Sequence, residues 1–174
     1  MTQQTDPEQA QGGRILIVED EPELLEPLDY SLRKAGFDTF AAADGLNACR
    51  MVGVCRPELI LLDIMLPDLD GWEVCRMIRN HPESRIASIP IIMMTALVTA
   101  DHKFKGLELG ADSYLPKPYS MKEVILQARN LVARRRQQEL LREEVDRRQR
   151  GDQLQSDLQN MIFHELRNHL LVIG

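Results

Sequence analysis

Four short apolar segments of this sequence lead into residues that could take part in group transfer. The first leads into Glu19 and Asp20, the second ends at Asp63, the third leads into Thr95 and the fourth into Lys117. Crowded carboxylates repel one another unless a cation lies among them, and an acidic, oxygen-rich site suits Mg²⁺. The chemistry that fits is phosphoryl transfer onto a carboxylate, with Asp63 as the nucleophile. Mg²⁺ and Lys117 would neutralise the phosphoryl oxygens, and the Thr95 hydroxyl would donate a hydrogen bond to one of them.

The segments that carry these residues alternate with helical patterns. Buried strands of parallel sheets appear as short apolar runs, and the carboxyl ends of such strands meet at one edge of the sheet. We therefore predict an α/β fold with a doubly wound, five-stranded parallel sheet. Strands are predicted at 14–18, 39–42, 59–63, 89–94 and 113–115. Helices are predicted at about 22–35, 45–55, 71–81 and 104–110, and from about 120 onward.

One residue conflicts with this pattern. Pro27 would remove a backbone donor from the second turn of the first helix. A bend at Pro27, or a later start of that helix, is therefore expected.

Composition excludes several classes of protein. The net charge is −6 and the first 120 residues carry the acidic excess, so no nucleic-acid partner is expected. No apolar run approaches the roughly 20 residues that cross a bilayer, so we predict no membrane partner and a cytoplasmic location. Cys49, Cys55 and Cys75 lack metal-site spacing and are expected to be buried free thiols.

Four motifs of the chain resemble a known family. They are Ile-Leu-Ile-Val-Glu-Asp-Glu at 15–21, Leu-Leu-Asp-Ile-Met-Leu-Pro-Asp-Leu-Asp-Gly at 61–71, Met-Thr-Ala at 94–96 and Tyr-Leu-Pro-Lys-Pro-Tyr at 114–119. The sequence is similar to the receiver domains of bacterial two-component signalling proteins. This resemblance covers residues 14–135 and implies a flavodoxin-like (βα)5 fold. Residues 1–13, which are polar and Gln-rich, are predicted to be a disordered leader.

The resemblance implies a role for each motif residue. Asp63 would accept a phosphoryl group from a histidine kinase or a phosphotransfer protein. Asp20 and Asp63 would ligate Mg²⁺, together with the backbone carbonyl of Met65 and, through water, Glu19.

The remaining roles concern the response to phosphorylation. Thr95 and Tyr114 match the family's switch pair, in which the hydroxyl moves toward the phosphate and the aromatic ring turns inward. Lys117 matches the lysine that pairs with the phosphoryl group, and the bond between Lys117 and Pro118 is expected to be cis.

A helical tail is predicted to follow the receiver. Residues 136–153 would form a helical linker, with a hinge or fraying expected near the polar segment 147–152, which contains Gly151. An apolar stripe then recurs at helical spacing, through Leu154, Leu158, Ile162, Leu166, Leu170 and Ile173. This stripe predicts a coiled coil that joins two copies of the chain as a homodimer.

The end of the tail resembles a second family. The segment 163–168, Phe-His-Glu-Leu-Arg-Asn, is similar to the phosphoacceptor box of sensor histidine kinases. The resemblance implies that His164 is phosphorylated, that Glu165 acts as its general base and that Asn168 positions a water for dephosphorylation. His169 stands where that family usually has proline. Residues 154–174 would then be the first part of a kinase dimerisation and phosphoacceptor helix, in a fragment without an ATP-binding domain.

Two other functions remain open at this point. The chain could be a stand-alone response regulator whose helical tail dimerises and whose His164 is inert. It could also be a metal-dependent phosphatase with an Asp nucleophile, but such enzymes commonly carry a second Asp two positions later, where this chain has Met65.

Overall fold

The computed structural model describes residues 12–96 and 110–172, with side chains through residue 163. Residues 1–11 of the predicted leader and most of the predicted helix at 104–110 lie outside the described residues. The described elements are β1 (Arg14–Val18), α1 (Pro22–Lys34), β2 (Asp38–Ala42), α2 (Gly45–Cys55), β3 (Leu59–Asp63), α3 (Gly71–Arg79), α4 (Ser84–Ala87), β4 (Ile91–Thr95), β5 (Ser113–Pro116) and α6 (Met121–Val172).

The five strands form one parallel sheet in the order β2-β1-β3-β4-β5. β3 lies at the centre and pairs with β1 on one side and with β4 on the other. This is the flavodoxin-like strand order, with its topological switch point beside β1 and β3. The predicted doubly wound, five-stranded fold is therefore confirmed.

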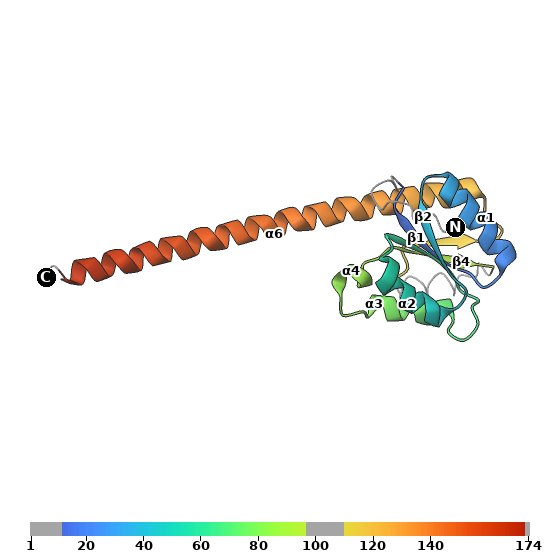
Figure 1. Cartoon of the computed structure of the whole chain (residues 1–174), viewed down its shortest axis with the longest axis horizontal. Coiled ribbons are helices and arrows are strands. Elements are labelled where there is room, and N and C mark those ends of the chain that lie inside the picture. Colours follow the sequence, from blue (N-terminus) through green and yellow to red (C-terminus); the bar gives the residue numbers. More distant parts are fainter. Residues whose placement is uncertain (1–11, 97–109, 173–174) are drawn as a thin grey trace, which may run out of the picture. The chain divides into compact units, whose positions relative to one another are not determined.

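Alternation along the strands divides the core into two layers. Side chains such as Leu16 and Leu62 pack with α2 and α3, whereas Ile17 and Leu61 pack with α1 and the beginning of α6. Figure 1 shows these helices on opposite sides of the sheet. Because helices cover both faces, β1, β3 and β4 are apolar along almost their whole length rather than in alternate positions.

Helix α1 begins at Pro22 and passes through Pro27, so the expected later start is wrong. Pro27 costs the helix one backbone hydrogen bond, but Leu28 and Leu32 are fully buried against the sheet and hold the helix in place. Pro27 also lines an apolar hollow of about 400 Å³, together with Leu24, Lys117, Pro118, Tyr119, Met121 and Glu23.

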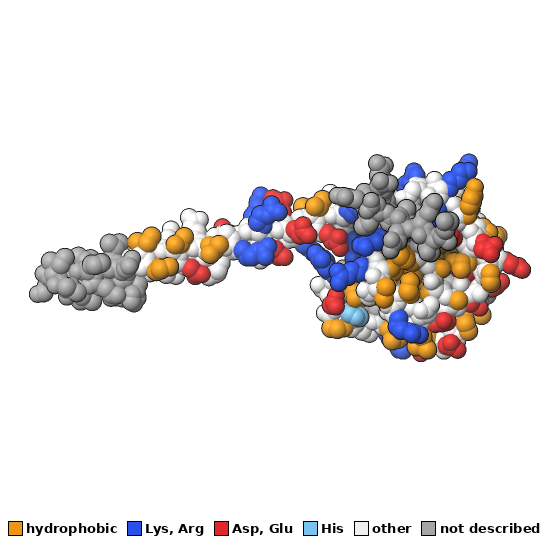
Figure 2. Space-filling view, viewed as in Figure 1, with side chains coloured by type: hydrophobic (Ala, Val, Ile, Leu, Met, Phe, Trp, Pro, Cys, Tyr) orange, Lys and Arg blue, Asp and Glu red, His pale blue; other side chains and the backbone are white. Residues whose placement is uncertain are grey.

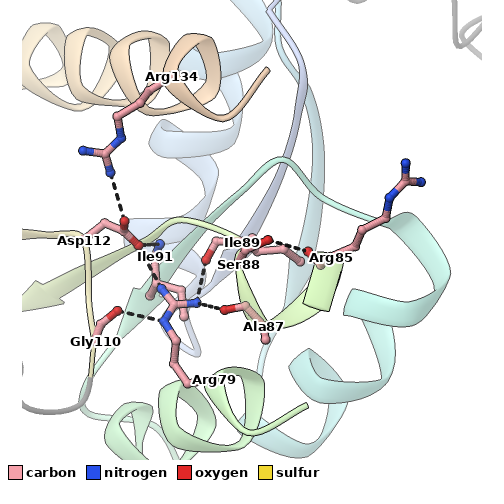
Figure 3. Close-up of polar contacts among 9 residues, drawn as sticks. All are labelled: Arg79, Arg85, Ala87, Ser88, Ile89, Ile91, Gly110, Asp112 and Arg134. Atoms are coloured by element: carbon pink, nitrogen blue, oxygen red, sulfur yellow. Dashed lines mark hydrogen bonds and ion pairs between the residues drawn. The ribbon is translucent and has the colours of Figure 1, made fainter. Parts of the chain in front are cut away.

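An ion-pair network ties the amino ends of β4 and β5 to three helices (Figure 3). Arg79, at the end of α3, donates to the carbonyls of Ala87, Ile89 and Gly110, and to Oδ2 of Asp112 at 2.8 Å. The other carboxylate oxygen of Asp112 accepts from Arg134 of α6 at 2.9 Å. Asp112 therefore connects α3, the sheet and α6 at the amino edge of the sheet, opposite the carboxyl ends of the strands.

The three cysteines are free thiols, as predicted. Cys55 and Cys75 are buried, but Cys49 is only half-buried. Burial raises the pKa of the Cys55 thiol to about 11, and its Sγ donates to the Met51 carbonyl at 3.0 Å. These thiols therefore belong to the packing of α2 and α3.

The chain divides into two compact units, Met1–Arg135 and Arg136–Gly174. We call the described part of the second unit, residues 136–172, the tail. The tail is one continuous helix, so the expected hinge or fraying at 147–152 is wrong. Gly151 lowers helix propensity by only about 1 kcal/mol, and the Arg148–Glu144 pair, at 2.9 Å, bridges the preceding turn.

Every side chain from 140 to 163 is exposed. Large apolar residues are among them: Leu140, Leu141, Val145, Leu154, Leu158, Met161, Ile162 and Phe163. Figure 2 shows hydrophobic side chains on the surface of this helix. Among the described residues, no helix combines the length and the apolar content that crossing a membrane would require.

Candidate functional site

Asp63 is the last residue of the central strand and is only 3% exposed. Four apolar residues fix the strand between both layers of the core, so the carboxylate is held at the carboxyl edge of the sheet. Glu19 follows directly after the neighbouring strand β1 and is fully buried. Its backbone N–H donates to the Ala42 carbonyl at 3.1 Å, which orders the turn that leaves β1.

Lys117 lies between these two carboxylates. Its Nζ is 2.7 Å from Oδ2 of Asp63 and 2.9 Å from Oε2 of Glu19. Burial alone would lower the pKa of Lys117, but the hydrogen bonds and the negative charges of Asp63 and Glu19 raise it above its usual value. Burial raises the pKa of Glu19, against the lowering effect of Lys117. The ammonium group of Lys117 is thus charged and can pair with the Asp63 carboxylate or with an anionic group bound to it.

Carboxylate oxygens of Glu19, Asp20 and Asp63 all lie within 4.8 Å of one another. Three carboxylates and one ammonium group leave a negative excess that a divalent cation would balance. An all-oxygen donor set of this size suits Mg²⁺, which usually keeps several waters beside one or two protein carboxylates. The residues present therefore fit the ion that the sequence predicted.

The loop from β3 to α3 orients the other oxygen of Asp63. The Met65 backbone N–H donates to Oδ1 at 3.1 Å, while the Met65 side chain is exposed. The Gly71 N–H donates to the Ile64 carbonyl at 3.0 Å, and the Asp70 side chain caps α3 by accepting from Glu73 N–H at 2.8 Å. That the Met65 carbonyl ligates a cation stays a prediction.

Gly71 also makes a contact that sequence reasoning missed. A Cβ at this position would lie 2.1 Å from the carbonyl oxygen of Asp63 and 2.9 Å from Cα of Ile64. The first turn of α3 is therefore pressed against the backbone of Asp63 itself. The Asp-Gly pair signals a turn in the sequence but says nothing about this close approach.

Thr95 ends β4, beside β3, and is buried. Its carbonyl accepts from the backbone N–H of Lys117 at 2.7 Å, so the turn that presents Lys117 starts from Thr95. The peptide bond between Lys117 and Pro118 is cis, as the family resemblance implies.

Tyr114 lies on β5 with its hydroxyl buried, and no hydrogen-bond partner of that hydroxyl is found among the described residues. Burial raises the pKa of Tyr114 to about 12. Its ring packs against Trp72 of α3, with 6.4 Å between the ring centroids and 40° between the planes. Sequence reasoning missed Trp72, because nothing in the spacing of the chain relates α3 to β5.

The predicted site residues of the tail are described only by their backbone. His164, Glu165 and Asn168 belong to α6 by their backbone, but their side chains lie outside the described residues. Their predicted roles are therefore not tested.

Comparison with known proteins agrees with the geometry. The sequence model of the response regulator receiver domain matches residues 15–129. Over 121 residues the chain is 45% identical to the transcriptional regulatory protein CusR of Escherichia coli K12 and 39% identical to the DNA-binding regulator RpaA of Synechocystis. These alignments cover 70% of this chain but 52% and 49% of the relatives, so the chain spans about half the length of the curated relatives it matches.

A solved structure gives the same result in three dimensions. The receiver domain of a sensor histidine kinase from Pseudomonas aeruginosa PAO1, described with magnesium coordinated in its active-site cleft, is 32% identical to this chain. The match has a TM-score of 0.64 and covers 70% of this chain and 98% of that domain.

Proposed function

Because this chain belongs to the response regulator receiver domain family, we propose that it accepts a phosphoryl group on Asp63 from a histidine kinase or a phosphotransfer protein. The observation that carries this proposal is the position of Lys117 Nζ, which touches both Asp63 and Glu19 at 2.7 and 2.9 Å. A buried carboxylate with an ammonium group already beside it suits the build-up of negative charge during phosphoryl transfer.

In the proposed reaction, one carboxylate oxygen of Asp63 bonds to phosphorus as the bond from phosphorus to the donor's imidazole nitrogen breaks. The leaving nitrogen keeps the electron pair. Lys117 shifts its hydrogen bond from Asp63 to a phosphoryl oxygen, and the Thr95 hydroxyl donates to another. Mg²⁺ would be held by Asp20, Asp63 and the Met65 carbonyl and, through water, by Glu19, and it would supply charge neutralisation at the phosphoryl oxygens. The Met65 N–H keeps Asp63 oriented throughout.

The apolar hollow beside Lys117 gives a donor protein a surface to contact. It is lined by Lys117, which bonds to Asp63, and largely by apolar residues of α1 and of the segment that follows β5. A donor bound there would reach Asp63 from the edge of the sheet where Asp63 is presented.

The test is the intact mass of the chain after incubation with acetyl phosphate and Mg²⁺. We expect a gain of one phosphoryl group that hydroxylamine removes, and its complete loss in Asp63→Asn. Asp68→Asn is the matched control, since it makes the same substitution in the same loop at an exposed carboxylate. A gain that persists in Asp63→Asn, or the absence of any gain in the unaltered chain, would refute the proposal.

The tail extends the proposal. It would be a dimerising helix that couples the receiver to a histidine kinase module, with residues 136–153 as linker and 154–174 as the start of the phosphoacceptor helix. Supporting this, the segment 163–168 resembles a phosphoacceptor box, and a solved relative is the receiver of a sensor kinase. His164 would then carry phosphate, with Glu165 and Asn168 in the roles given above.

The alternative output has support of its own. CusR is a transcriptional regulator and RpaA is a DNA-binding one, so a stand-alone regulator with an inert tail is the second candidate. The prediction that this chain has no nucleic-acid partner is correspondingly unsupported. Coding sequence downstream of Gly174 separates the two: an ATP-binding domain favours the kinase, and a DNA-binding domain or a stop codon favours the regulator.

Dimerisation through the tail is expected because its apolar side chains are exposed in the isolated chain. Placing a charge at Leu158 should weaken the dimer about a hundredfold or more, because each copy loses about 1.5–3 kcal/mol of apolar burial. Sedimentation equilibrium of Leu158→Glu against the unaltered chain measures this loss. Gln155→Glu, also on an exposed part of the tail, is the control and should leave the dimer intact. A monomeric unaltered chain would contradict the dimer.

A further inference from the structure

Trp72 is the only tryptophan of the chain. It belongs to α3 and is almost fully buried in the core layer that α2 and α3 form with the sheet. Its ring meets that of Tyr114, with 6.4 Å between the centroids and a tilt of 40°. This separation is within the range in which aromatic pairs attract each other. The two residues come from α3 and β5, which are remote in sequence.

Trp72 is also tied to the reactive carboxylate through the backbone. It directly follows Gly71, whose N–H donates to the Ile64 carbonyl and whose Cα is pressed against the Asp63 carbonyl. A shift of the backbone at Asp63 or Ile64 therefore cannot leave the first turn of α3 in place. The indole ring is the first large side chain on that turn.

We propose that Trp72 is the positioning residue of Tyr114, and that it relays the state of the loop after Asp63 to the tyrosine ring. This inference rests on the proposed function, in which Tyr114 changes position after phosphorylation. It adds a route through α3 to the route through the Thr95 hydroxyl that the family resemblance implies.

The surroundings of Tyr114 explain why an aromatic neighbour would matter. Its hydroxyl is buried without a hydrogen-bond partner among the described residues, so within that part of the chain the ring is held by packing rather than by a hydrogen bond of its hydroxyl. Ring packing against Trp72 is one of the contacts that hold the side chain against the core layer of α2 and α3. If the indole moves with α3, Tyr114 loses that support and must find another position.

Two spectroscopic signals test the proposal in the whole chain. Emission from the single tryptophan reports Trp72, and ¹⁹F NMR of protein labelled with 3-fluorotyrosine reports the three tyrosines, with Tyr114→Phe identifying one resonance. We expect acetyl phosphate and Mg²⁺ to change both signals, and Trp72→Leu to abolish most of the Tyr114 shift while the phosphoryl gain by mass stays the same. Trp72→Phe should restore most of it.

Phe37→Leu is the matched control, because it shortens a buried aromatic residue in the other core layer. It should leave the Tyr114 shift intact. Should Trp72→Leu not fold, Trp72→Met takes its place, with the same loss of the Tyr114 shift expected. A full Tyr114 shift in a folded Trp72→Leu chain would overturn the role of Trp72. An absent phosphoryl gain in the unaltered chain would instead overturn the proposed function.

In the unphosphorylated chain the contact can be tested on its own. Trp72→Leu should move the Tyr114 resonance and leave those of Tyr30 and Tyr119 in place, because among the described residues the tyrosine ring in contact with Trp72 is that of Tyr114. Identical resonances in the two proteins would show that the contact is absent in solution and would overturn the proposal.

Discussion

Replacing Gly71 with alanine should destabilise the receiver by at least about 3 kcal/mol and abolish phosphoryl uptake at Asp63. The added methyl group would lie 2.1 Å from the carbonyl oxygen of Asp63, and this neighbour is backbone, so no side-chain rotation relieves the clash. Either α3 or the end of β3 must move, and both position the reactive carboxylate. Urea denaturation and the acetyl phosphate assay measure the two effects.

The control for this prediction is Gly53→Ala. Gly53 lies inside α2, and a Cβ there would meet nothing within 4 Å. Alanine should raise the stability of the helix by about 0.5–1 kcal/mol and leave phosphoryl uptake unchanged. If Gly71→Ala were as stable and as active as Gly53→Ala, the close approach at Asp63 would not exist in solution.

The second large effect is expected from Lys117→Met, which keeps most of the length of the side chain but removes its charge. Glu19 and Asp63 would then be two buried carboxylates without their common partner, which should cost about 3–5 kcal/mol of stability. Phosphoryl uptake should fall by a factor of about a hundred or more, because the ammonium group no longer neutralises the phosphoryl oxygens.

Two further variants test whether the charge of Lys117 is responsible for both effects. Glu19→Gln combined with Lys117→Met should recover part of the lost stability but none of the uptake, because it removes one of the unpaired charges. Lys122→Met, at an exposed position early in α6, should change neither quantity.

Calorimetric titration with Mg²⁺ should show tighter binding to Lys117→Met than to the unaltered chain. Unchanged stability and uptake in Lys117→Met would contradict the role given to the lysine.

The position of most candidate site residues can be predicted from the sequence. Apolar runs locate the strands, and the residues that follow them share the carboxyl edge of a parallel sheet. This logic placed Glu19, Asp63 and Lys117 together, and the structure joins them by hydrogen bonds. The chemistry of the residue types suggested the roles of Asp63, Lys117 and Thr95, and the motifs added those of Met65 and Tyr114. All of these roles remain proposals.

The contacts that could not be predicted from the sequence depend on how helices, strands and loops pack against one another. The approach of Gly71 to Asp63 follows from the path of the loop after β3, and the contact of Trp72 with Tyr114 from the packing of α3 beside β5. Helix propensities also gave wrong predictions at two residues. Pro27 and Gly151 each weaken a helix, but α1 and α6 run through them, since one unfavourable residue is outweighed by its neighbours.

The contacts of Asp112 and α6 bear on where this protein could be divided. The match to the receiver family stops at residue 129, yet Leu131 and Val132 are buried in the core and Arg134 bonds to Asp112. Cutting the chain at the edge of the sequence match would strip two apolar side chains from the layer beneath α6 and leave Asp112 with a single arginine. The compact unit that contains these contacts ends at Arg135, so swapping the tail for another output should begin after that residue.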